Sequence, residues 1–303
     1  MDFKPEKGIK EEPDFLVVYG QAGLGKTTFA SQAPKPLFID PRSGSKQLDV
    51  ERLQPKTWNE YVEMIKWSIP KDYKSIVLDE MNFIDQMAQT YIWEKYYQDK
   101  GTSFATLKLN GSNYNVLNEM YKTEFLPLLD SIIASGKNLI IVAHPEVKDM
   151  ADPLTAENYI RYQLGLSNGL NQMLKRACHN LFFINKDVFI VGEKDNKRVI
   201  ADDKIYIFTQ FHQAYDAKQR FDLPSKIELE KGKDMWKVFQ GLKKVETEAG
   251  IISQIEGYIP MFPKRDGSGK QGTTREGIAE QLKKNLSLDE LRNLRTNLQG
   301  AVK

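Results

Sequence analysis

Eight residues near the amino terminus have the types and spacing that bind phosphate. The run Gly20-Gln21-Ala22-Gly23-Leu24-Gly25-Lys26-Thr27 matches the pattern G-x-x-x-x-G-K-[ST] in full. Glycines let the backbone curl so that successive N–H groups face a phosphate group. In such a loop the lysine reaches the β- and γ-phosphates and the threonine hydroxyl binds Mg²⁺. The pattern therefore predicts that residues 20–28, through Thr28, bind ATP, with Lys26 also catalytic and Thr27 a metal ligand.

Two carboxylates that follow in the chain have the complementary chemistry. Asp79 and Glu80 come directly after the apolar run 75–78. A carboxylate at the carboxyl end of a strand can hold the Mg²⁺ opposite Thr27, so Asp79 is predicted to be the second metal ligand. Glu80 is predicted to polarise the attacking water. The alternative for Asp79 is that it caps the helix that follows.

Three other residues are candidates for contact with the γ-phosphate. His144 follows the apolar run 138–143, where a polar group could sense that phosphate; the alternative is a surface histidine that closes a strand. Lys218 and Arg220 lie two positions apart in a segment expected to be extended, so both could reach one phosphate group. The alternative for this pair is a solvated basic surface.

Strands and helices are expected to alternate around these residues. Apolar, β-rich runs predict strands at 15–19, 36–40, 75–79 and 138–143. Helices are expected at 27–32, 57–67 (opened by a Thr57–Glu60 capping box), 83–97 and 114–135. Alternation implies parallel pairing, helices on both faces, and ligands at the carboxyl ends of the strands. The predicted fold is α/β, with a mostly parallel central sheet flanked by helices.

The pattern changes after His144. Residues 145–170 are expected to form a long, partly irregular connection. Strands are expected at 182–184, 188–191 and 204–208, with a hairpin that turns at Asp195-Asn196. The Gly-, Ser- and Lys-rich stretch 263–273 is typical of a flexible linker.

A C-terminal helical extension is predicted beyond that linker. Two capping boxes open short helices, and leucines at helical spacing form one apolar stripe: Thr273 with Glu276, Ser287 with Glu290, and Leu288, Leu291, Leu294 and Leu298. The expected organisation is a lead-in at 1–13, a core at 14–235, a connecting segment at 236–262, the linker at 263–273 and a helical tail at 274–303.

Composition narrows the classes of protein. The chain has 303 residues, of which 41% are hydrophobic and 28% charged, which is typical of a globular protein with a sizeable core. Its one cysteine, Cys178, excludes an intramolecular disulfide and fits a reducing compartment, and the three histidines show no zinc-ligand spacing. No apolar run reaches the roughly 18 residues of a membrane span, and no signal peptide opens the chain. We therefore expect a cytoplasmic protein without a membrane partner.

The formal net charge of +2 hides an uneven distribution. Residues 161–198 contain seven basic and three acidic residues, and residues 264–303 contain nine basic and five acidic residues. Segregated positive charge is what binding to a polyanion requires, although two solvated basic faces are the alternative. The candidates for DNA contact are Arg161, Lys175, Arg176, Lys194, Lys197 and Arg198.

These motifs together resemble the RecA-like P-loop ATPases encoded by bacteriophages, particularly the Sak-type single-strand annealing and recombination ATPases. The resemblance covers roughly residues 14–230. It rests on the loop 20–27, Thr57-Trp58, Ser75–Glu80, Gly111-x-x-Tyr114, Ile140–His144 and Ala217-Lys218-Gln219-Arg220-x-x-Leu223-Pro224.

The resemblance implies a slow ATPase that binds ATP and Mg²⁺, oligomerises on single-stranded DNA and acts in phage recombination or replication. It also implies that Lys218 and Arg220 reach the γ-phosphate of a neighbouring subunit, so that the nucleotide lies between two copies. One departure concerns the second strand: some RecA-like proteins have a catalytic glutamate just beyond it, whereas this chain has Arg42, which cannot act as a base. Either Glu80 takes that role or hydrolysis is feeble.

Two other functions are open on the sequence alone. A nucleotide-switched adaptor or helicase-loader-like replication protein would use the stripe Leu288–Leu298 to bind a single-strand binding or replication protein; the alternative is that this stripe packs on its own core or on the next subunit. A small-molecule kinase is also compatible with the P-loop, because a fold alone does not fix function.

Overall fold

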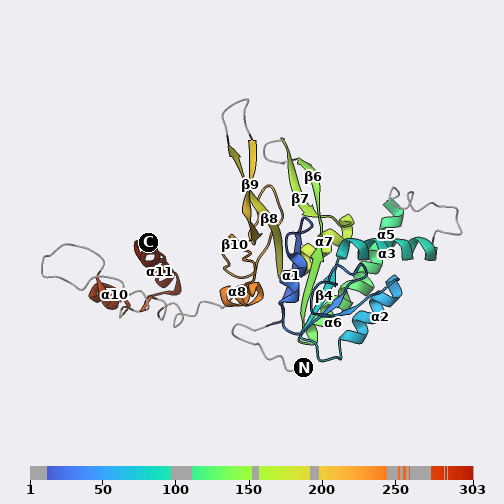
Figure 1. The fold of residues 1–303 in the computed structure, drawn as a ribbon, viewed down its shortest axis with the longest axis horizontal. Coiled ribbons are helices and arrows are strands. Elements are labelled where there is room, and N and C mark those ends of the chain that lie inside the picture. Colours follow the sequence, from blue (N-terminus) through green and yellow to red (C-terminus); the bar gives the residue numbers. More distant parts are fainter. Residues whose placement is uncertain are drawn as a thin grey trace, which may run out of the picture. The chain divides into compact units, whose positions relative to one another are not determined.

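The computed structural model describes residues 12–96, 111–151, 157–191 and 198–243, and in the C-terminal part 252, 255, 256, 259, 274–282, 284 and 286–302. The chain forms two compact units, Met1–Leu242 and Lys243–Lys303 (Figure 1). Everything that the motifs single out for nucleotide chemistry lies in the first unit.

An eight-stranded sheet forms the centre of the first unit. Its strands, in spatial order, are β10 (Lys226–Glu228), β9 (Arg198–Phe208), β8 (Asn180–Val191), β1 (Phe15–Gly20), β5 (Asn138–Ala143), β4 (Ser75–Asp79), β2 (Pro36–Ile39) and β3 (Glu51–Leu53). Pairing is parallel from β8 to β3 and antiparallel between β8, β9 and β10. The predicted α/β fold with a mostly parallel sheet is therefore confirmed.

Helices cover both faces of this sheet. The helices of the first unit are α1 (Lys26–Ser31), α2 (Trp58–Ser68), α3 (Met81–Tyr96), α5 (Gly111–Met120), the π-helical turn η2 (Tyr121–Phe125), α6 (Leu126–Ala134), α7 (Asn168–Ala177) and α8 (Met235–Leu242). Side chains of α2, α3, α5, α6 and α7 pack on one face, and those of α1 and α8 pack on the other.

Strand β1 shows why the core strands appear in the sequence as continuous apolar runs. Its odd-numbered residues from Phe15 to Tyr19 join the core on one face, and Leu16 and Val18 join the core on the other. A strand buried on both faces must be apolar at every position, although its side chains alternate. The same arrangement in β4 and β5 fixes the three strands whose carboxyl ends carry the motifs.

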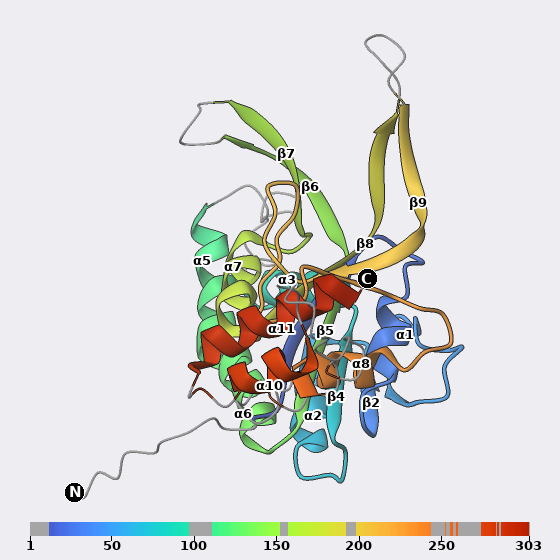
Figure 2. The same ribbon diagram turned by 90° about the vertical axis from the view of Figure 1, so that its left-hand side faces the viewer.

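The expectation for residues 145–170 was wrong. These residues form an antiparallel hairpin of β6 (Pro145–Ala151) and β7 (Asn158–Leu164), which leads into α7. The hairpin stands out from the body of the unit (Figures 1 and 2). Most of β6 is exposed or half-buried. Because β6 does not pack on the main core, its sequence has no apolar run that would predict a strand.

The predicted hairpin is longer than expected. Strands β8 and β9 pair from Phe183 with Phe208 to Val191 with Arg198, with an irregularity between Lys186 and Val188. The predicted turn at 195–196 lies outside the described residues. Lys194 and Lys197 lie outside them too.

The described part of the C-terminal unit includes the helices α10 (Arg275–Leu282) and α11 (Leu288–Val302). The predicted capping box at Ser287 is present, because Ser287 Oγ accepts from Glu290 N–H at 3.4 Å and Glu290 Oε2 accepts from Ser287 N–H at 2.8 Å. In α10, Gly277 N–H donates to Thr274 Oγ1 at 3.3 Å. Thr273 of the predicted Thr273–Glu276 capping box lies outside the described residues. No helix in the described part of the chain is long and apolar enough to cross a membrane.

Candidate nucleotide site

The phosphate-binding loop joins β1 to α1, as its motif requires. Gly25 precedes α1 with φ of 86°, a left-handed conformation that favours glycine. A Cβ on Gly20 would lie 2.1 Å from the carbonyl oxygen of Ile184 in β8, so no larger residue fits there. The two glycines thus serve different purposes: one allows the turn into the helix and the other allows two strands to approach.

Lys26 is held inside this loop. Its side chain is buried, and Nζ donates to the carbonyl oxygen of Gln21 at 2.7 Å. Burial lowers the pKa of Lys26, and the charges of Asp79 and Glu80 oppose that shift. The ammonium group is therefore positioned between the backbone of the loop and two carboxylates.

Thr27 and Asp79 lie side by side. Thr27 Oγ1 donates to Asp79 Oδ2 at 2.8 Å, although the two residues come from α1 and from the end of β4. Burial raises the pKa of Asp79 to about 6, while the hydrogen bond from Thr27 lowers it and the nearby charges of Asp40 and Glu80 raise it. A hydroxyl and a carboxylate at this distance can contribute to the shell of one cation.

These groups fit Mg²⁺ bound together with a nucleotide. In the described part of the chain, no group of three or more His, Cys, Asp or Glu residues is placed to hold a metal ion. Mg²⁺ does not need such a cage, because it is usually held by one or two protein groups together with phosphate oxygens and water. The loop would hold the phosphates, and Thr27 and Asp79 would hold the metal.

The raised pKa of Asp79 predicts pH-dependent Mg²⁺ binding. Protons compete with the metal for a carboxylate, so Mg²⁺ affinity of the nucleotide complex should fall about tenfold per pH unit below pH 6 and level off above it. Calorimetric Mg²⁺ titrations between about pH 5 and about pH 8 measure this. Asp79→Asn is the control, because only the titration of the nucleotide itself should remain. A wild-type profile identical to that of Asp79→Asn would contradict the assignment.

Glu80 lies between the imidazole of His144 and the guanidinium group of Arg42. Its Oε2 is 2.6 Å from His144 Nε2, and its Oε1 is 4.0 Å from Arg42 Nη1. The hydrogen bond from His144 is the main reason that the pKa of Glu80 is lowered, with the charge of Arg42 contributing. The carboxylate is thus kept ionised and oriented, and His144 contacts Glu80 at the carboxyl end of the sheet. Arg42, which stands where some RecA-like proteins have a catalytic glutamate after the second strand, is thus a neighbour of Glu80.

Asn82 ties this pair to the β6–β7 hairpin. Its Oδ1 accepts from His144 N–H at 2.6 Å, and its Nδ2 donates to the Gly165 carbonyl oxygen, also at 2.6 Å. Gly165 N–H in turn donates to the His144 carbonyl oxygen at 2.9 Å. Gly165 directly follows β7, so one side chain near Glu80 fixes both ends of the hairpin.

Lys218 and Arg220 lie away from the phosphate-binding loop of their own chain. Lys218 pairs with Leu181, which is level with Val17 and therefore below the loop that follows Gly20. From there the segment runs antiparallel to β8, which takes Arg220 further from the carboxyl ends of the strands.

The two side chains differ in their surroundings. Lys218 Nζ donates to the carbonyl oxygens of Lys175 at 3.0 Å, Arg176 at 3.3 Å and Cys178 at 2.8 Å, at the end of α7. It therefore caps that helix and is not directed at a phosphate group. Arg220 is exposed.

The structure separates the DNA-contact candidates. Arg161 is only 8% exposed and is paired with Asp216 at 2.9 Å, and Lys175 is paired with the same carboxylate. The expectation that Arg161 presents a free charge to solvent is therefore corrected, because that charge is neutralised inside the protein. Arg176 is exposed. Arg198 opens β9, and its side chain is not described.

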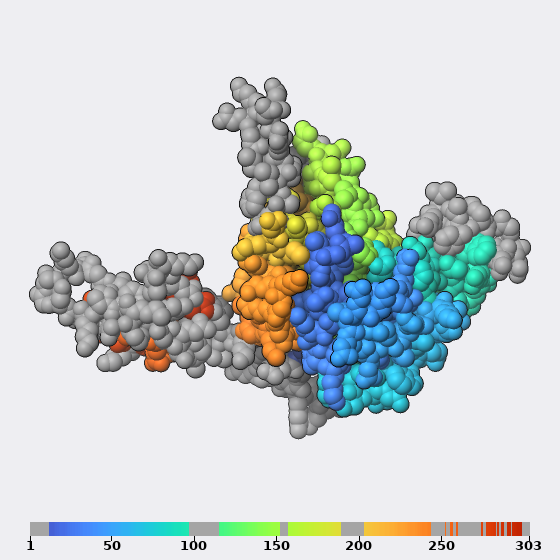
Figure 3. All heavy atoms as spheres, in the orientation of Figure 1, coloured from blue at the N-terminus to red at the C-terminus, as the bar shows by residue number. Residues whose placement is uncertain are grey.

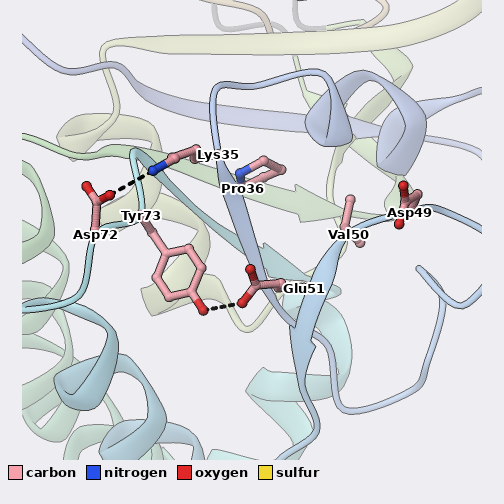
Figure 4. Close-up of a pocket in the computed structure, with 7 residues that line it drawn as sticks. All are labelled: Lys35, Pro36, Asp49, Val50, Glu51, Asp72 and Tyr73. Carbon is pink, nitrogen blue, oxygen red and sulfur yellow. Dashed lines mark hydrogen bonds and ion pairs between the residues drawn. The ribbon is translucent and has the colours of Figure 1, made fainter.

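A cavity at the other end of the sheet is not the nucleotide site. It has a volume of about 420 Å³ and lies at the amino ends of β2, β3 and β4, where the ion pair Lys35–Asp72 and the hydrogen bond between Tyr73 and Glu51 cross it (Figure 4). Ligands of parallel sheets bind at the carboxyl ends of strands, where the phosphate-binding loop is.

Sequence reasoning missed three residues of this region: Asn82, Asp216 and Asp40, whose buried carboxylate accepts from Ser45. Asn82 and Asp216 depend on partners from distant parts of the chain, whereas the Asp40 carboxylate is held locally by Ser45. No motif includes these three residues. The only available signal was the position of Asn82, two residues after Glu80.

Known proteins are similar to this chain in sequence pattern or in fold. A protein-family model described as AAA domain matches residues 13–221. No curated protein shows significant sequence similarity to the chain. Among similar solved structures is a KaiC-like protein from the archaeon Pyrococcus horikoshii OT3, which is 13% identical, with 73% of this chain and 87% of that chain covered and a TM-score of 0.38.

Proposed function

The chain belongs to a family of AAA domains, which are nucleotide-binding P-loop ATPases. We propose that it hydrolyses ATP slowly as an oligomer on single-stranded DNA and promotes annealing or recombination. The observation that carries the nucleotide part is the 2.8 Å contact between Thr27 and Asp79 beside a complete phosphate-binding loop. The DNA part rests on the resemblance to phage recombination ATPases and on exposed cations near α7.

The residues divide the work of hydrolysis among them. The loop 20–28 binds the phosphates, and Lys26 leaves Gln21 to contact the β- and γ-phosphates. Thr27 and Asp79 would hold Mg²⁺, which would neutralise charge on the phosphates. Glu80 orients the attacking water and accepts its proton, while His144 fixes the orientation of that carboxylate.

Arg220 would act on a second copy of the chain. Because it is exposed and lies away from its own loop, it can contribute to ATP hydrolysis only at the site of a neighbouring subunit. Lys218 supports it by capping α7. This changes the expected role of Lys218 from a second phosphate contact to a positioning residue.

Asn82 would couple the nucleotide site to DNA. A change at Glu80 moves His144, and Asn82 transmits the movement to Gly165 and the β6–β7 hairpin. We expect Asn82→Ala to abolish DNA stimulation of ATP turnover while ATP still binds. It should also cost about 1–3 kcal/mol of stability, because the His144 N–H loses its partner.

Turnover assays with and without single-stranded DNA, together with thermal melts, measure both effects. Asn59→Ala is the matched control, since Asn59 is exposed on α2; it should behave as wild type. Full DNA stimulation of the Asn82→Ala protein would contradict the coupling.

Size analysis with single-stranded DNA tests the proposed function as a whole. We expect the assembly to grow when DNA and a nonhydrolysable ATP analogue are both present, and DNA affinity to fall steeply with salt. A protein that stays the same size with both ligands, and that shows no DNA binding at low salt, would overturn the DNA part and leave the nucleotide part standing.

The structure does not favour the alternative of an adaptor that binds a partner protein through the stripe Leu288–Leu298. Leu291 and Leu298 are buried against Ile255 and Ile278 within the C-terminal unit. The apolar stripe is therefore used to form a small core in that unit, and these two leucines are not available to a partner protein.

A further inference from the structure

Phe211 has the highest exposure of any large apolar side chain in the described parts of the chain, at 67%. It lies shortly after β9, and its ring is covered on one side by the guanidinium group of Arg161, whose Cζ is 4.4 Å from the ring centroid. Since one face is covered, much of the exposed area must belong to the opposite face. The open face of the ring is therefore available for stacking against another planar group.

The support beneath the ring is fixed. Arg161 is almost fully buried, its Nη2 is 2.9 Å from Asp216 Oδ1, and it also donates to the carbonyl oxygens of His212 at 3.2 Å and Tyr215 at 3.3 Å. These three contacts are all made by Nη2, and together with burial they hold the guanidinium group in place. The cation–π contact therefore holds Phe211 in one orientation before any ligand arrives.

Cations outnumber carboxylates around Arg161. Asp216 is shared by Arg161 and Lys175, so the three groups together carry a net positive charge. Lys148 lies directly opposite Arg161 in the register of β6 and β7 and is exposed. On the same face of β6, Glu146 adds one negative charge and accepts a hydrogen bond from the neutral amide of Gln163. Asp149 is next to Lys148, and opposite residues of a pair share a face, so Asp149 points to the other side.

We propose that Phe211 is a stacking platform for one unpaired base of single-stranded DNA, with Arg161 as its fixed support. This inference rests on the proposed DNA function and names the place where a base binds. A planar ring with one open face matches a base, and the surrounding cations match a phosphate backbone. Proteins that bind single strands without sequence preference combine these two features.

The platform is connected to the nucleotide site. Tyr162 N–H donates to the Ala214 carbonyl oxygen at 2.8 Å, and Asp216 N–H donates to the Tyr162 carbonyl oxygen at 3.2 Å. The segment that carries Phe211 thus runs along β7 and moves with it. Strand β7 leads to Gly165, which Asn82 ties to His144. Figure 3 shows the hairpin residues exposed at the surface.

The test compares two strands of equal length in fluorescence anisotropy: oligo(dT) and an abasic strand that has the backbone without bases. We expect Phe211→Ala in the full chain to weaken oligo(dT) binding about tenfold or more and to leave the weaker abasic binding unchanged. The salt dependence should stay the same, because no phosphate contact is lost. Phe211→Trp should keep or strengthen oligo(dT) binding, and ATP turnover without DNA should match wild type in both variants.

Trp67 provides the matched control. It is another exposed aromatic residue, at 47%, with the Lys71 ammonium nitrogen 4.9 Å from its ring centroid, but it lies on α2. Trp67→Ala should bind both strands as wild type does. Three results would overturn the platform: unchanged oligo(dT) affinity in Phe211→Ala, an equal loss for the abasic strand, or a change in oligomer size without DNA, which would make this face an interface between copies. Absence of DNA binding by the wild type would instead overturn the proposed function, and the platform with it.

Discussion

Replacing Arg220 with alanine is expected to lower ATP turnover about 10³-fold or more while ATP affinity and melting temperature stay at wild-type values. A trans-acting arginine that stabilises charge on the transferred phosphoryl group contributes effects of this size. Arg220 is exposed and lies away from the loop that follows Gly20, so its removal disturbs neither the core nor the binding site of its own chain. Steady-state turnover, calorimetric ATP binding and thermal melts measure the three quantities.

Mixing subunits distinguishes an arginine that acts on a neighbour from one that acts within its own chain. Lys26→Ala subunits cannot bind the phosphates but carry an intact Arg220, and Arg220→Ala subunits have the reverse defect. A mixture of the two inactive proteins should therefore regain part of the turnover. Equal inactivity of the mixture at every ratio would show that the site is not shared.

Lys218→Ala is the informative companion to Arg220→Ala. Lys218 satisfies three carbonyl groups at the end of α7, so its loss should lower the melting temperature, which Arg220→Ala should not do. ATP turnover should fall less than in Arg220→Ala, because Lys218→Ala can only displace Arg220 and does not remove it.

Glu80→Gln is the second change with a large expected effect. It should slow ATP hydrolysis about 10²- to 10⁴-fold, the range attributed to a positioned general base, with ATP affinity preserved. The amide keeps the size of the side chain and can still accept from His144 Nε2, but it cannot accept a proton. Single-turnover hydrolysis and calorimetric binding separate the two effects.

The lowered pKa of Glu80 adds a pH signature. Because the hydrogen bond from His144 favours the ionised carboxylate, hydrolysis at saturating Mg²⁺ should not depend on Glu80 protonation near neutral pH, and the Glu80-dependent part of the rate should fall only as pH drops toward the lowered pKa of that group. His144→Ala removes the main cause of the shift, so the acidic limb of the rate profile should move to higher pH. If Glu80→Gln hydrolysed ATP at the wild-type rate, another residue would have to be the general base.

The nucleotide site could be predicted because its residues are local. Gly20 to Thr27 are consecutive, and Asp79 ends a strand whose burial on both faces makes it apolar throughout. Parallel pairing then places these elements at one edge of the sheet. Thr27 and Asp79 are the two residues that are distant in sequence and must come into contact. The order of strands and helices predicts that this contact lies at the carboxyl ends of the strands.

The β6–β7 hairpin and the burial of its charges could not be predicted, because both depend on contacts that leave no local pattern in the sequence. Strand β6 covers no core, so no apolar pattern marks it. The basic charge at Arg161 is visible in the sequence, but its burial is not, because Asp216 pairs with it from a distant part of the chain. Charge counts along a sequence cannot distinguish an exposed cation from a neutralised one.

Calorimetric titration of ATP with and without Mg²⁺ tests the central claim most directly, namely that one loop and one opposing acid bind the nucleotide and its metal. The account predicts binding by the wild type that Mg²⁺ strengthens, loss of only the Mg²⁺-dependent part in Thr27→Val and Asp79→Asn, and loss of all binding in Lys26→Ala. Thr27→Val and Asp79→Asn titrations that coincide with the wild type in Mg²⁺, or a wild type that releases no heat with ATP, would contradict it.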